Sequence, residues 1–295
     1  MTLEQLSVFI AVAEREHLTR GASAIGVSPS AASAAIKALE AYYDVRLFDR
    51  VGRQIELTRE GRVLLAEARL TVAQVRRTES VLSELGSLRT GILDVEASQT
   101  VANYWLPPRL LRFQGQFPGV TINFEVGNTD QVARAVIDGR AELGFVEGSV
   151  EEPVLATTAV VRDRLVVVTA AGLRTEFSDL KWVMRERGSG TRAVFEAAMA
   201  AAGYDLGALR VALVLPTNEA VLSAVRSGTA AAALSEMVVT PFVKSGELQV
   251  VDIELPPRQF SILRHRERRL SAAATRFEAL CREGYEALPP ATVTD

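Results

Sequence analysis

Four short stretches of this 295-residue sequence combine glycine, hydroxyl and amide groups, which can bind small anions without a metal ion. Each stretch follows a short apolar run and opens a segment of helical periodicity, where free backbone N–H groups and the helix dipole favour negative charge. The stretches are Ser98-Gln99-Thr100, Gly127-Asn128-Thr129, Gly188-Ser189-Gly190-Thr191 and Thr217-Asn218. Ordinary capping explains any single stretch, because Ser, Thr and Asn are the commonest N-caps. Several stretches that converge are better explained by ligand contact.

A carboxylate is expected beside these stretches. Glu147 follows an apolar run at 143–146, where it would face the same ligand and select against some anions. Arg187 and Arg192 flank the third stretch and either add positive charge there or remain solvated. The candidate ligand-binding residues are Ser98, Gln99, Thr100, Asn128, Glu147, Gly188, Ser189, Gly190, Thr191 and Asn218.

The residues that usually carry catalysis are sparse. Histidine occurs only at His17 and His265, and cysteine only at Cys281. We find no Walker A motif, metal-ligand cluster or nucleophile elbow, and the third stretch lacks the Gly-Lys-Ser/Thr of a phosphate loop. The sequence therefore predicts a binding protein without a metal or cofactor, not an enzyme.

Alternating strands and helices must position the candidate ligand site. Strands are expected at 92–97, 120–126, 143–146, 165–169, 211–215, 231–234 and near 260–264, and helices at 101–117, 129–138, 191–202, 218–227 and 271–287. This α/β alternation predicts parallel sheets, with ligands beyond the carboxyl ends of the strands. Two similar units predict two Rossmann-like lobes around a cleft, with lobe one at 91–161 plus 266–295 and lobe two at 162–265.

The first sixty residues carry a helix-turn-helix pattern. Apolar spacing predicts a helix to about residue 16, and Thr19 is expected to cap a short helix at 20–25. Ser28 caps a third helix that has Pro29 at its first position and a small apolar inner stripe. A short helix, a glycine turn and a capped helix with a small inner face are typical of DNA-binding proteins, although a plain three-helix bundle shares the pattern.

Polar and basic groups on this N-terminal region can contact DNA. The exposed face of the third helix offers hydroxyl groups and one lysine, and two short strands at 46–57 form a wing with arginines. The candidate DNA-binding residues are Thr19, Ser28, Pro29, Ser30, Ser33, Lys37, Arg50 and Arg53. Acidic and basic residues nearly cancel over residues 1–60 and the whole chain has a net charge of −3, so this prediction depends on pattern and not on charge.

A long helix is predicted between the two regions. It begins after Thr58, ends near residue 88, and spans roughly 45 Å at 1.5 Å per residue. Its apolar and small residues recur at three and four positions, at Leu64, Ala68, Thr71, Val75, Thr78, Leu82 and Leu85. This stripe favours a coiled-coil linker between two copies of the chain, and the alternative is a helix that packs within one chain.

The N-terminal motifs resemble the signature of LysR-type transcription regulators. The resemblance is carried by Leu18-Thr19-Arg20-Gly21-Ala22, Val27-Ser28-Pro29-Ser30-Ala31-Ala32-Ser33, Ala38-Leu39-Glu40, Arg46-Leu47-Phe48-Asp49-Arg50 and Leu57-Thr58-Arg59-Glu60-Gly61. It implies a winged helix-turn-helix at 1–57, a linker and dimerisation helix at 58–90, and an α/β sensor of periplasmic-binding-protein type. Family members commonly carry Gln then Pro where this chain has Pro29 and Ser30, and often Arg at Ala34, so the operator sequence is not inferred.

The sensor motifs narrow the resemblance. Ala97-Ser98-Gln99-Thr100, Phe145-Val146-Glu147-Gly148 and 185–192 are similar to regulators of sulfite reduction and sulfur assimilation, and to regulators of carbon-fixation operons. The resemblance implies double-stranded DNA and a small anionic co-inducer as partners, with sulfite or sulfate favoured over a phosphorylated or carboxylated metabolite. It also implies a dimer or tetramer and contact with RNA polymerase.

Transport is the remaining alternative. A solute-binding protein would share the two lobes, but it should carry a signal sequence and lack residues 1–90. The N-terminus has neither a basic nor an apolar leader segment, and no apolar run approaches the roughly 18 residues of a membrane span. The single cysteine suits a reducing compartment, so a cytoplasmic location without a membrane partner is expected.

Overall fold

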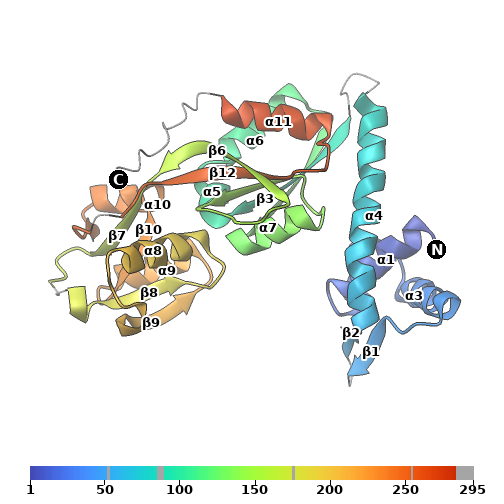
Figure 1. Cartoon of the computed structure of the whole chain (residues 1–295), viewed down its shortest axis with the longest axis horizontal. Coiled ribbons are helices and arrows are strands. Elements are labelled where there is room, and N and C mark those ends of the chain that lie inside the picture. Colours follow the sequence, from blue (N-terminus) through green and yellow to red (C-terminus); the bar gives the residue numbers. More distant parts are fainter. Residues whose placement is uncertain (52–53, 85–89, 175–176, 254, 284–295) are drawn as a thin grey trace. The chain divides into compact units, whose positions relative to one another are not determined.

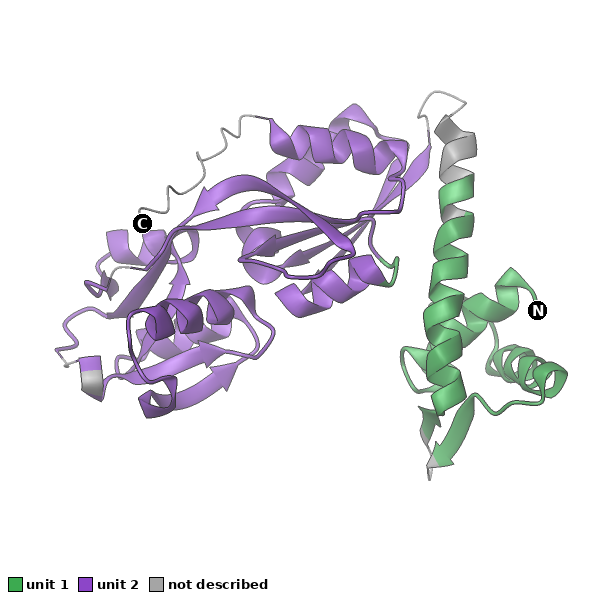
Figure 2. Cartoon of the chain, viewed as in Figure 1, with its two compact units in different colours: residues 1–82, 138–140 green, residues 83–137, 141–295 purple. Residues whose placement is uncertain are grey.

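The computed structural model describes residues 1–51, 54–84, 90–174, 177–253 and 255–283 of the chain (Figure 1). The chain divides into two compact units, Met1–Leu82 with Asp138–Arg140, and Ser83–Ile137 with Ala141–Asp295 (Figure 2). None of the described helices is both long enough and apolar enough to cross a bilayer.

The first unit is a winged helix-turn-helix followed by a long helix. Its elements are α1 (Leu3–Ala13), α2 (Leu18–Ala24), α3 (Pro29–Tyr43), β1 (Phe48–Val51), β2 (Gln54–Leu57) and α4 (Arg59–Glu84). The two strands form an antiparallel hairpin in which Phe48 pairs with Leu57. The prediction that Thr19 caps α2 is wrong: Nδ1 of His17 accepts from the backbone N–H of Arg20 at 3.3 Å, and Thr19 lies inside the helix.

The core of this unit explains why the helices lie close together. A Cβ on Gly21 would lie 2.5 Å from Cα of Val12, so the approach of α2 to α1 requires glycine. The first part of the α4 stripe is intramolecular, because Ala68 is buried with Phe9 and Leu39. Val63, outside that stripe, is 62% exposed, and the predicted stripe positions Leu82 and Leu85 fall outside the described side chains.

The second unit contains two five-stranded sheets, which we call lobe one and lobe two (Figure 1). Lobe one has the strand order β4-β3-β5-β12-β6 and lobe two the order β11-β7-β10-β8-β9. Lobe one comprises β3 (Gly91–Ser98), α5 (Gln99–Tyr104), α6 (Pro107–Gln116), β4 (Val120–Gly127), α7 (Thr129–Ile137), β5 (Leu143–Glu147), β6 (Leu155–Asp163), β12 (Arg258–His265) and α11 (Ala272–Arg282). Lobe two comprises β7 (Leu165–Ala170), η1 (Phe177–Asp179), β8 (Lys181–Arg185), α8 (Gly190–Ala201), η2 (Leu206–Ala208), β9 (Arg210–Leu215), α9 (Asn218–Arg226), β10 (Ala231–Ser235), α10 (Glu236–Lys244) and β11 (Leu248–Val250).

Helices cover both faces of each sheet. In lobe one, Phe113 of α6 and Phe277 of α11 lie in one buried cluster with ring centroids 5.2 Å apart, while α7 covers the opposite face with Val132. In lobe two, α8 packs around Trp182, and α9 and α10 pack on the other side of the sheet. Apolar residues on both faces of the central strands account for this three-layer arrangement.

Three sequence predictions for the sensor need correction. The sheets are mixed and not purely parallel, since β12 is antiparallel to both β5 and β6, and β10 is antiparallel to β7. The single helix expected at 101–117 is two helices, because Pro107 lacks the N–H that a continuous helix needs and begins α6. The boundary that assigned residues 258–265 to lobe two is wrong, because β12 completes the sheet of lobe one.

The two strands that connect the lobes run side by side. β6 leads out of lobe one and β12 returns to it, and they pair antiparallel from Arg258↔Asp163 to His265↔Leu155 (Figure 1). The parallel strands β3 and β5 place their carboxyl ends next to this crossing. Residues that follow strands in both lobes can therefore meet there.

Candidate functional site

A buried polar cluster joins the two lobes. It consists of residues that are each at most 5% exposed, and we call it the interlobe cluster: Ser98, Thr100 and Glu147 of lobe one, Thr191 and Asn218 of lobe two, and Arg258 at the start of β12. Five of these six residues are among the predicted ligand-binding positions. Their meeting follows from strand order, because β3 and β5 are neighbours in one sheet and α8 and α9 begin at the facing edge of the other.

The carboxylate of Glu147 lies at the centre of the cluster. Ser98 Oγ donates to Oε2, while Thr100 Oγ1 and Thr191 Oγ1 each donate to Oε1 at 3.3 Å. Hydrogen bonds to a charged acceptor are stronger than neutral ones, and a buried carboxylate needs them. Hydroxyl groups from both lobes thus converge on one negative charge.

The other partners of these hydroxyl groups fix the direction of the protons. Asn218 Nδ2 donates to Thr100 Oγ1 at 3.0 Å, and Arg258 Nη1 donates to Thr191 Oγ1 at 3.1 Å. Each threonine hydroxyl has a single proton, so it accepts from one side and donates to Glu147 on the other. Arg185 Nη1 in turn donates to Asn218 Oδ1 at 2.5 Å, which fixes the orientation of that amide.

The backbone allows a close approach at the start of α8. A Cβ on Gly190 would lie 2.2 Å from the carbonyl oxygen of Glu147 and 2.6 Å from Thr129 Oγ1. The N–H of Gly190 donates to that same Thr129 hydroxyl at 3.1 Å. Glycine is therefore required where α8 of lobe two meets the end of β5.

Further contacts across the lobes surround the cluster. Gln99 accepts from the N–H of Asn218 at 3.0 Å and donates to the carbonyl of Pro216 at 2.8 Å. Asn103 Nδ2 donates to Glu219 Oε1 at 3.0 Å. Burial raises the pKa of the neighbouring Tyr104 hydroxyl, and the negative charge of Glu219 raises that pKa further.

Three of the predicted ligand-binding residues make no hydrogen bond to Glu147. The amide of Asn128 caps α7, since Oδ1 accepts from the N–H of Gln131 at 3.0 Å, and its Nδ2 donates to Glu186 at 3.3 Å. The carbonyl of Gly188 accepts from the N–H of Asp130 at 3.2 Å. Ser189 precedes α8, and its Oγ is buried without a hydrogen-bond partner among the described residues.

Sequence reasoning missed the arginines of this site. Arg185 and Arg258 are only 3% and 4% exposed, which is rare for arginine. Arg258 pairs with Asp163, 95 residues earlier in the chain, so no local pattern signals it. Within the described part of the chain, no group of three His, Cys, Asp or Glu residues could hold a metal ion.

The described DNA-contacting candidates lie on α2, on α3 and its cap, and on the wing. Ala32, Ile36 and Leu39 of α3 are buried, as predicted. Ser28 Oγ accepts from the N–H of Ala31 at 3.2 Å, so Ser28 caps α3 as expected. Of the eight candidates, Thr19, Ser28, Pro29, Ser30, Lys37 and Arg50 are exposed, Ser33 is half-buried and Arg53 falls outside the described residues.

Two side chains hold the wing on the helices. Glu40 Oε1 accepts from the N–H of Leu47 at 2.8 Å. Thr58 Oγ1 donates to the carbonyl of Arg46 at 2.7 Å and accepts from the N–H of Gly61 at 2.9 Å, so it caps α4 and closes the base of the wing. These contacts fix the wing that carries Arg50 to the unit that contains α3.

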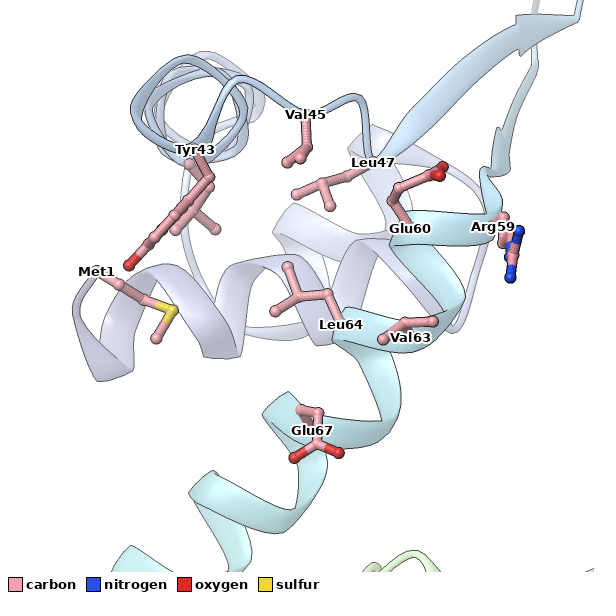
Figure 3. A pocket seen from close by; sticks show the side chains of 10 residues that line it. Met1, Tyr43, Val45, Leu47, Arg59, Glu60, Val63, Leu64 and Glu67 are labelled. Atoms are coloured by element: carbon pink, nitrogen blue, oxygen red, sulfur yellow. The ribbon is translucent and has the colours of Figure 1, made fainter.

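An apolar groove of about 440 Å³ lies between α4 and the rest of this unit. Figure 3 shows Met1 and Tyr43 on one side of the groove and Val63, Leu64 and Glu67 of α4 on the other. Leu64 also contacts the core of the unit, whereas Val63 and Tyr43 are exposed. The groove is therefore an apolar surface and is separate from the polar interlobe cluster.

Comparison with protein families gives two matches. Residues 3–62 match the bacterial regulatory helix-turn-helix proteins of the lysR family, and residues 86–286 match the LysR substrate binding domain. Two similar proteins are an uncharacterized HTH-type transcriptional regulator, YeiE of Escherichia coli (strain K12), and the RuBisCO operon transcriptional regulator of Allochromatium vinosum. YeiE is 33% identical over 95% of this chain and 97% of its own length. The RuBisCO operon regulator is 30% identical over 94% of both chains.

Solved structures share the fold. Full-length CbnR complexed with its target DNA has a TM-score of 0.66 at 22% identity, and the match covers 96% of this chain and 99% of that one. The regulatory domain of CcmR from Synechocystis PCC6803 in complex with 2-PG has a TM-score of 0.58 at 24% identity, over 65% of this chain and 96% of that domain.

Proposed function

The chain belongs to the LysR family of bacterial transcriptional regulators, and from that premise we propose that the interlobe cluster binds a small anionic effector that changes DNA binding. The coarse function follows from the family: this is a DNA-binding regulator with an effector-binding domain, and it is not an enzyme. The effector, its contacts and the assembly are our proposals. The observation that supports them best is the convergence of three hydroxyl groups from two lobes on one buried negative charge.

A sulfur oxyanion is the effector that we favour. The cluster is small and polar, but its three hydroxyl protons are already directed at the carboxylate of Glu147, so a ligand there must also interact with that carboxylate. An unprotonated anion would be repelled by that carboxylate, whereas an anion with an O–H group can donate to it. Sulfite is partly protonated near neutral pH and sulfate is not, so this reasoning favours sulfite. A phosphorylated or carboxylated metabolite is the alternative, and the complex of CcmR with 2-PG keeps it open.

The remaining predicted residues have supporting roles in this proposal. Gln99, Asn218 and the Gly188–Thr191 segment connect the lobes around the ligand, and Asn128 stabilises the neighbouring corner. Ligand binding favours one arrangement of the lobes, and that shift changes how the DNA-binding units bend DNA. The effector must bind the two arrangements with different affinity, because equal affinity would shift nothing.

We propose that α3 enters the major groove and that the wing contacts the backbone beside it. Ser30, Ser33 and Lys37 then face the DNA from α3, Thr19 and the Ser28-Pro29 cap lie beside the phosphates, and Arg50 and Arg53 reach from the wing. CbnR, a family member with the same fold, was solved on its target DNA. The regulator acts in the cytoplasm, where DNA and RNA polymerase are available to it.

Self-association is part of the proposal. Val63 and Leu70 are exposed seven positions apart on α4, and seven is the repeat of a two-stranded coiled coil. The apolar groove beside Val63 adds to this surface. A dimer would present two α3 helices to two half-sites, and pairs of dimers would form the tetramer.

A thermal-shift screen tests the effector. The purified chain is heated with sulfite, sulfate, thiosulfate, sugar phosphates or small carboxylates, and a ligand at 100 times its Kd should stabilise the native state by about 2.7 kcal/mol. Thr191→Val removes a hydroxyl group of the cluster and should abolish the shift, while Thr157→Val on the exposed face of β6 should not. A shift that survives Thr191→Val would place the ligand elsewhere, and no shift with any anion would overturn the anionic effector.

A further inference from the structure

Arg258 and Asp163 lie where the chain passes between the lobes. They are register partners at the ends of β12 and β6, and Nε of Arg258 donates to Oδ2 of Asp163 at 2.6 Å. Both side chains are almost fully buried, at 2% and 1% exposed. The other oxygen of Asp163 accepts from Ser235 Oγ at 2.7 Å, and Ser235 caps α10 in lobe two. The ion pair therefore contacts both crossing strands and lobe two.

The guanidinium of Arg258 has donors to spare. Arginine carries five N–H groups, of which Nε–H goes to Asp163 and one on Nη1 goes to Thr191. Nη2 is buried, and it makes no hydrogen bond to any residue that the structure describes. A buried charged group without full hydrogen bonding costs free energy, so a donor left in this way calls for a ligand or water.

A second buried group without a partner lies close by in the chain. Ser189 is 2% exposed, and its Oγ has no hydrogen-bond partner in the part of the chain that the structure describes. Ser189 is two residues from Thr191, the hydroxyl that receives Nη1 of Arg258 and donates to Glu147. The start of α8 thus carries an unsatisfied hydroxyl group two residues before the threonine that binds Arg258.

We propose that Arg258 supplies the positive charge that binds the effector, through Nη2, and that Asp163 holds the guanidinium in place for it. This inference rests on the proposed function and adds to it a residue that no sequence motif indicated. The ligand class is a small protonated oxyanion. One unprotonated oxygen accepts from Nη2, and its O–H group donates to the carboxylate of Glu147.

The position of the pair explains how binding would reach the rest of the molecule. A ligand oxygen that accepts from Nη2 competes for the same guanidinium that binds Asp163 of β6 and Thr191 of α8. Segments that connect two lobes absorb the dihedral changes of closure. Arg258 is therefore placed to sense the ligand and to alter the crossing strands in the same event.

Calorimetric titration of the full chain with sulfite, sulfate and inorganic phosphate tests the inference. Arg258→Lys keeps the charge but loses the fork of donors, and we expect sulfite affinity to fall by about tenfold or more. The double variant Arg258→Gln with Asp163→Asn removes both charges, so that neither is left buried alone, and it should lose affinity at least as much. Arg164→Gln removes a neighbouring charge that is 62% exposed, and it should bind like the wild type.

The melting temperature and the DNA affinity of each variant are measured without ligand as well. If Arg258 had a purely structural role, its replacement would lower both quantities. Loss of sulfite binding in variants that still melt cooperatively and bind DNA supports a ligand contact. Unchanged sulfite affinity in both Arg258 variants overturns this inference and leaves the proposed function standing. If the wild type binds none of the three anions, a small inorganic oxyanion is not the effector, and the role proposed for Arg258 is wrong with it.

Discussion

Oγ1 of Thr191 lies 3.3 Å from Oε1 of Glu147, and these two atoms belong to different lobes. The hydroxyl accepts from Arg258, so its proton points at the carboxylate. A hydrogen bond to a charged group contributes about 1.5–3 kcal/mol, more than a neutral one. Glu147 therefore links the lobes in the arrangement seen here.

Replacement of this carboxylate should loosen the link. In Glu147→Gln the amide presents one acceptor and one donor to hydroxyl groups that all donate, so at least one of them loses its acceptor. We expect the free energy of unfolding to fall by about 1–3 kcal/mol. Chemical denaturation measures it, and small-angle scattering should show the sensor less compact.

Glu125→Gln is the matched control, because Glu125 lies on β4 of the same lobe and is exposed. Its free energy of unfolding should lie within about 0.5 kcal/mol of the wild-type value. Equal stability of the two variants would mean that the carboxylate of Glu147 does not hold the lobes.

The start of α8 should not tolerate a side chain. In Gly190→Ala the new Cβ would meet the carbonyl oxygen of Glu147 at 2.2 Å, so either α8 or the end of β5 must move. Overpacking of this kind costs about 1–3 kcal/mol, and the movement should also weaken ligand binding. Denaturation and the thermal-shift screen measure the two effects.

Gly115→Ala controls for the change of residue type. Gly115 lies inside α6, and its Cβ would meet nothing within 4 Å. Alanine there should be neutral or stabilising by up to about 1 kcal/mol, since glycine is a poor helix former. If both variants had the same stability and ligand affinity, the close contact at Gly190 would not explain the need for glycine there.

Local signals in the sequence account for the parts of the fold that were predicted correctly. Ser28 followed by Pro29 places the start of α3, because both residues act through neighbouring backbone groups. The corner residues Ser98, Thr100 and Thr191 follow strands, and residues at the carboxyl ends of strands meet at one edge of the sheets, as these do at Glu147. These inferences need no knowledge of distant segments.

Distant partners decided what the sequence did not show. β6 carries threonines among its apolar residues, and it is recognisable as a strand only through β12, about a hundred residues later. From the sequence alone Arg258 is expected to be solvated, and only its ion pair with Asp163 shows why it is buried. Thr19 has the preferred residue type for an N-cap, yet His17 two residues earlier makes the hydrogen bond, so residue type alone did not place the start of α2.

Lys37 should contribute to DNA affinity without contributing to sequence preference. It is exposed on α3 and can reach a phosphate, so Lys37→Gln removes one charge contact. We expect weaker binding to all DNA sequences and a salt dependence reduced by about one in its logarithmic slope. Fluorescence anisotropy over a range of salt concentrations measures both.

Lys181→Gln changes charge by the same amount at an exposed position of β8 in the sensor. It should leave affinity and slope unchanged. If Lys181→Gln lost more DNA affinity than Lys37→Gln, the DNA-contacting surface would not include α3.

Cys281 should be inert in the native chain. Burial raises the pKa of its thiol from 9.0 to about 12, and the positive charge of Arg109 opposes that shift only in part. The thiolate is the reactive form, so iodoacetamide at pH 8 should modify the urea-unfolded chain and not the native one.

Because the pKa of the Cys281 thiol is higher in the folded chain, its contribution to stability is complete below pH 9 and is lost between pH 9 and about 12. Cys281→Ala should remove that part of the pH dependence, and an unchanged profile, or native labelling at the unfolded rate, would contradict the buried, protonated thiol.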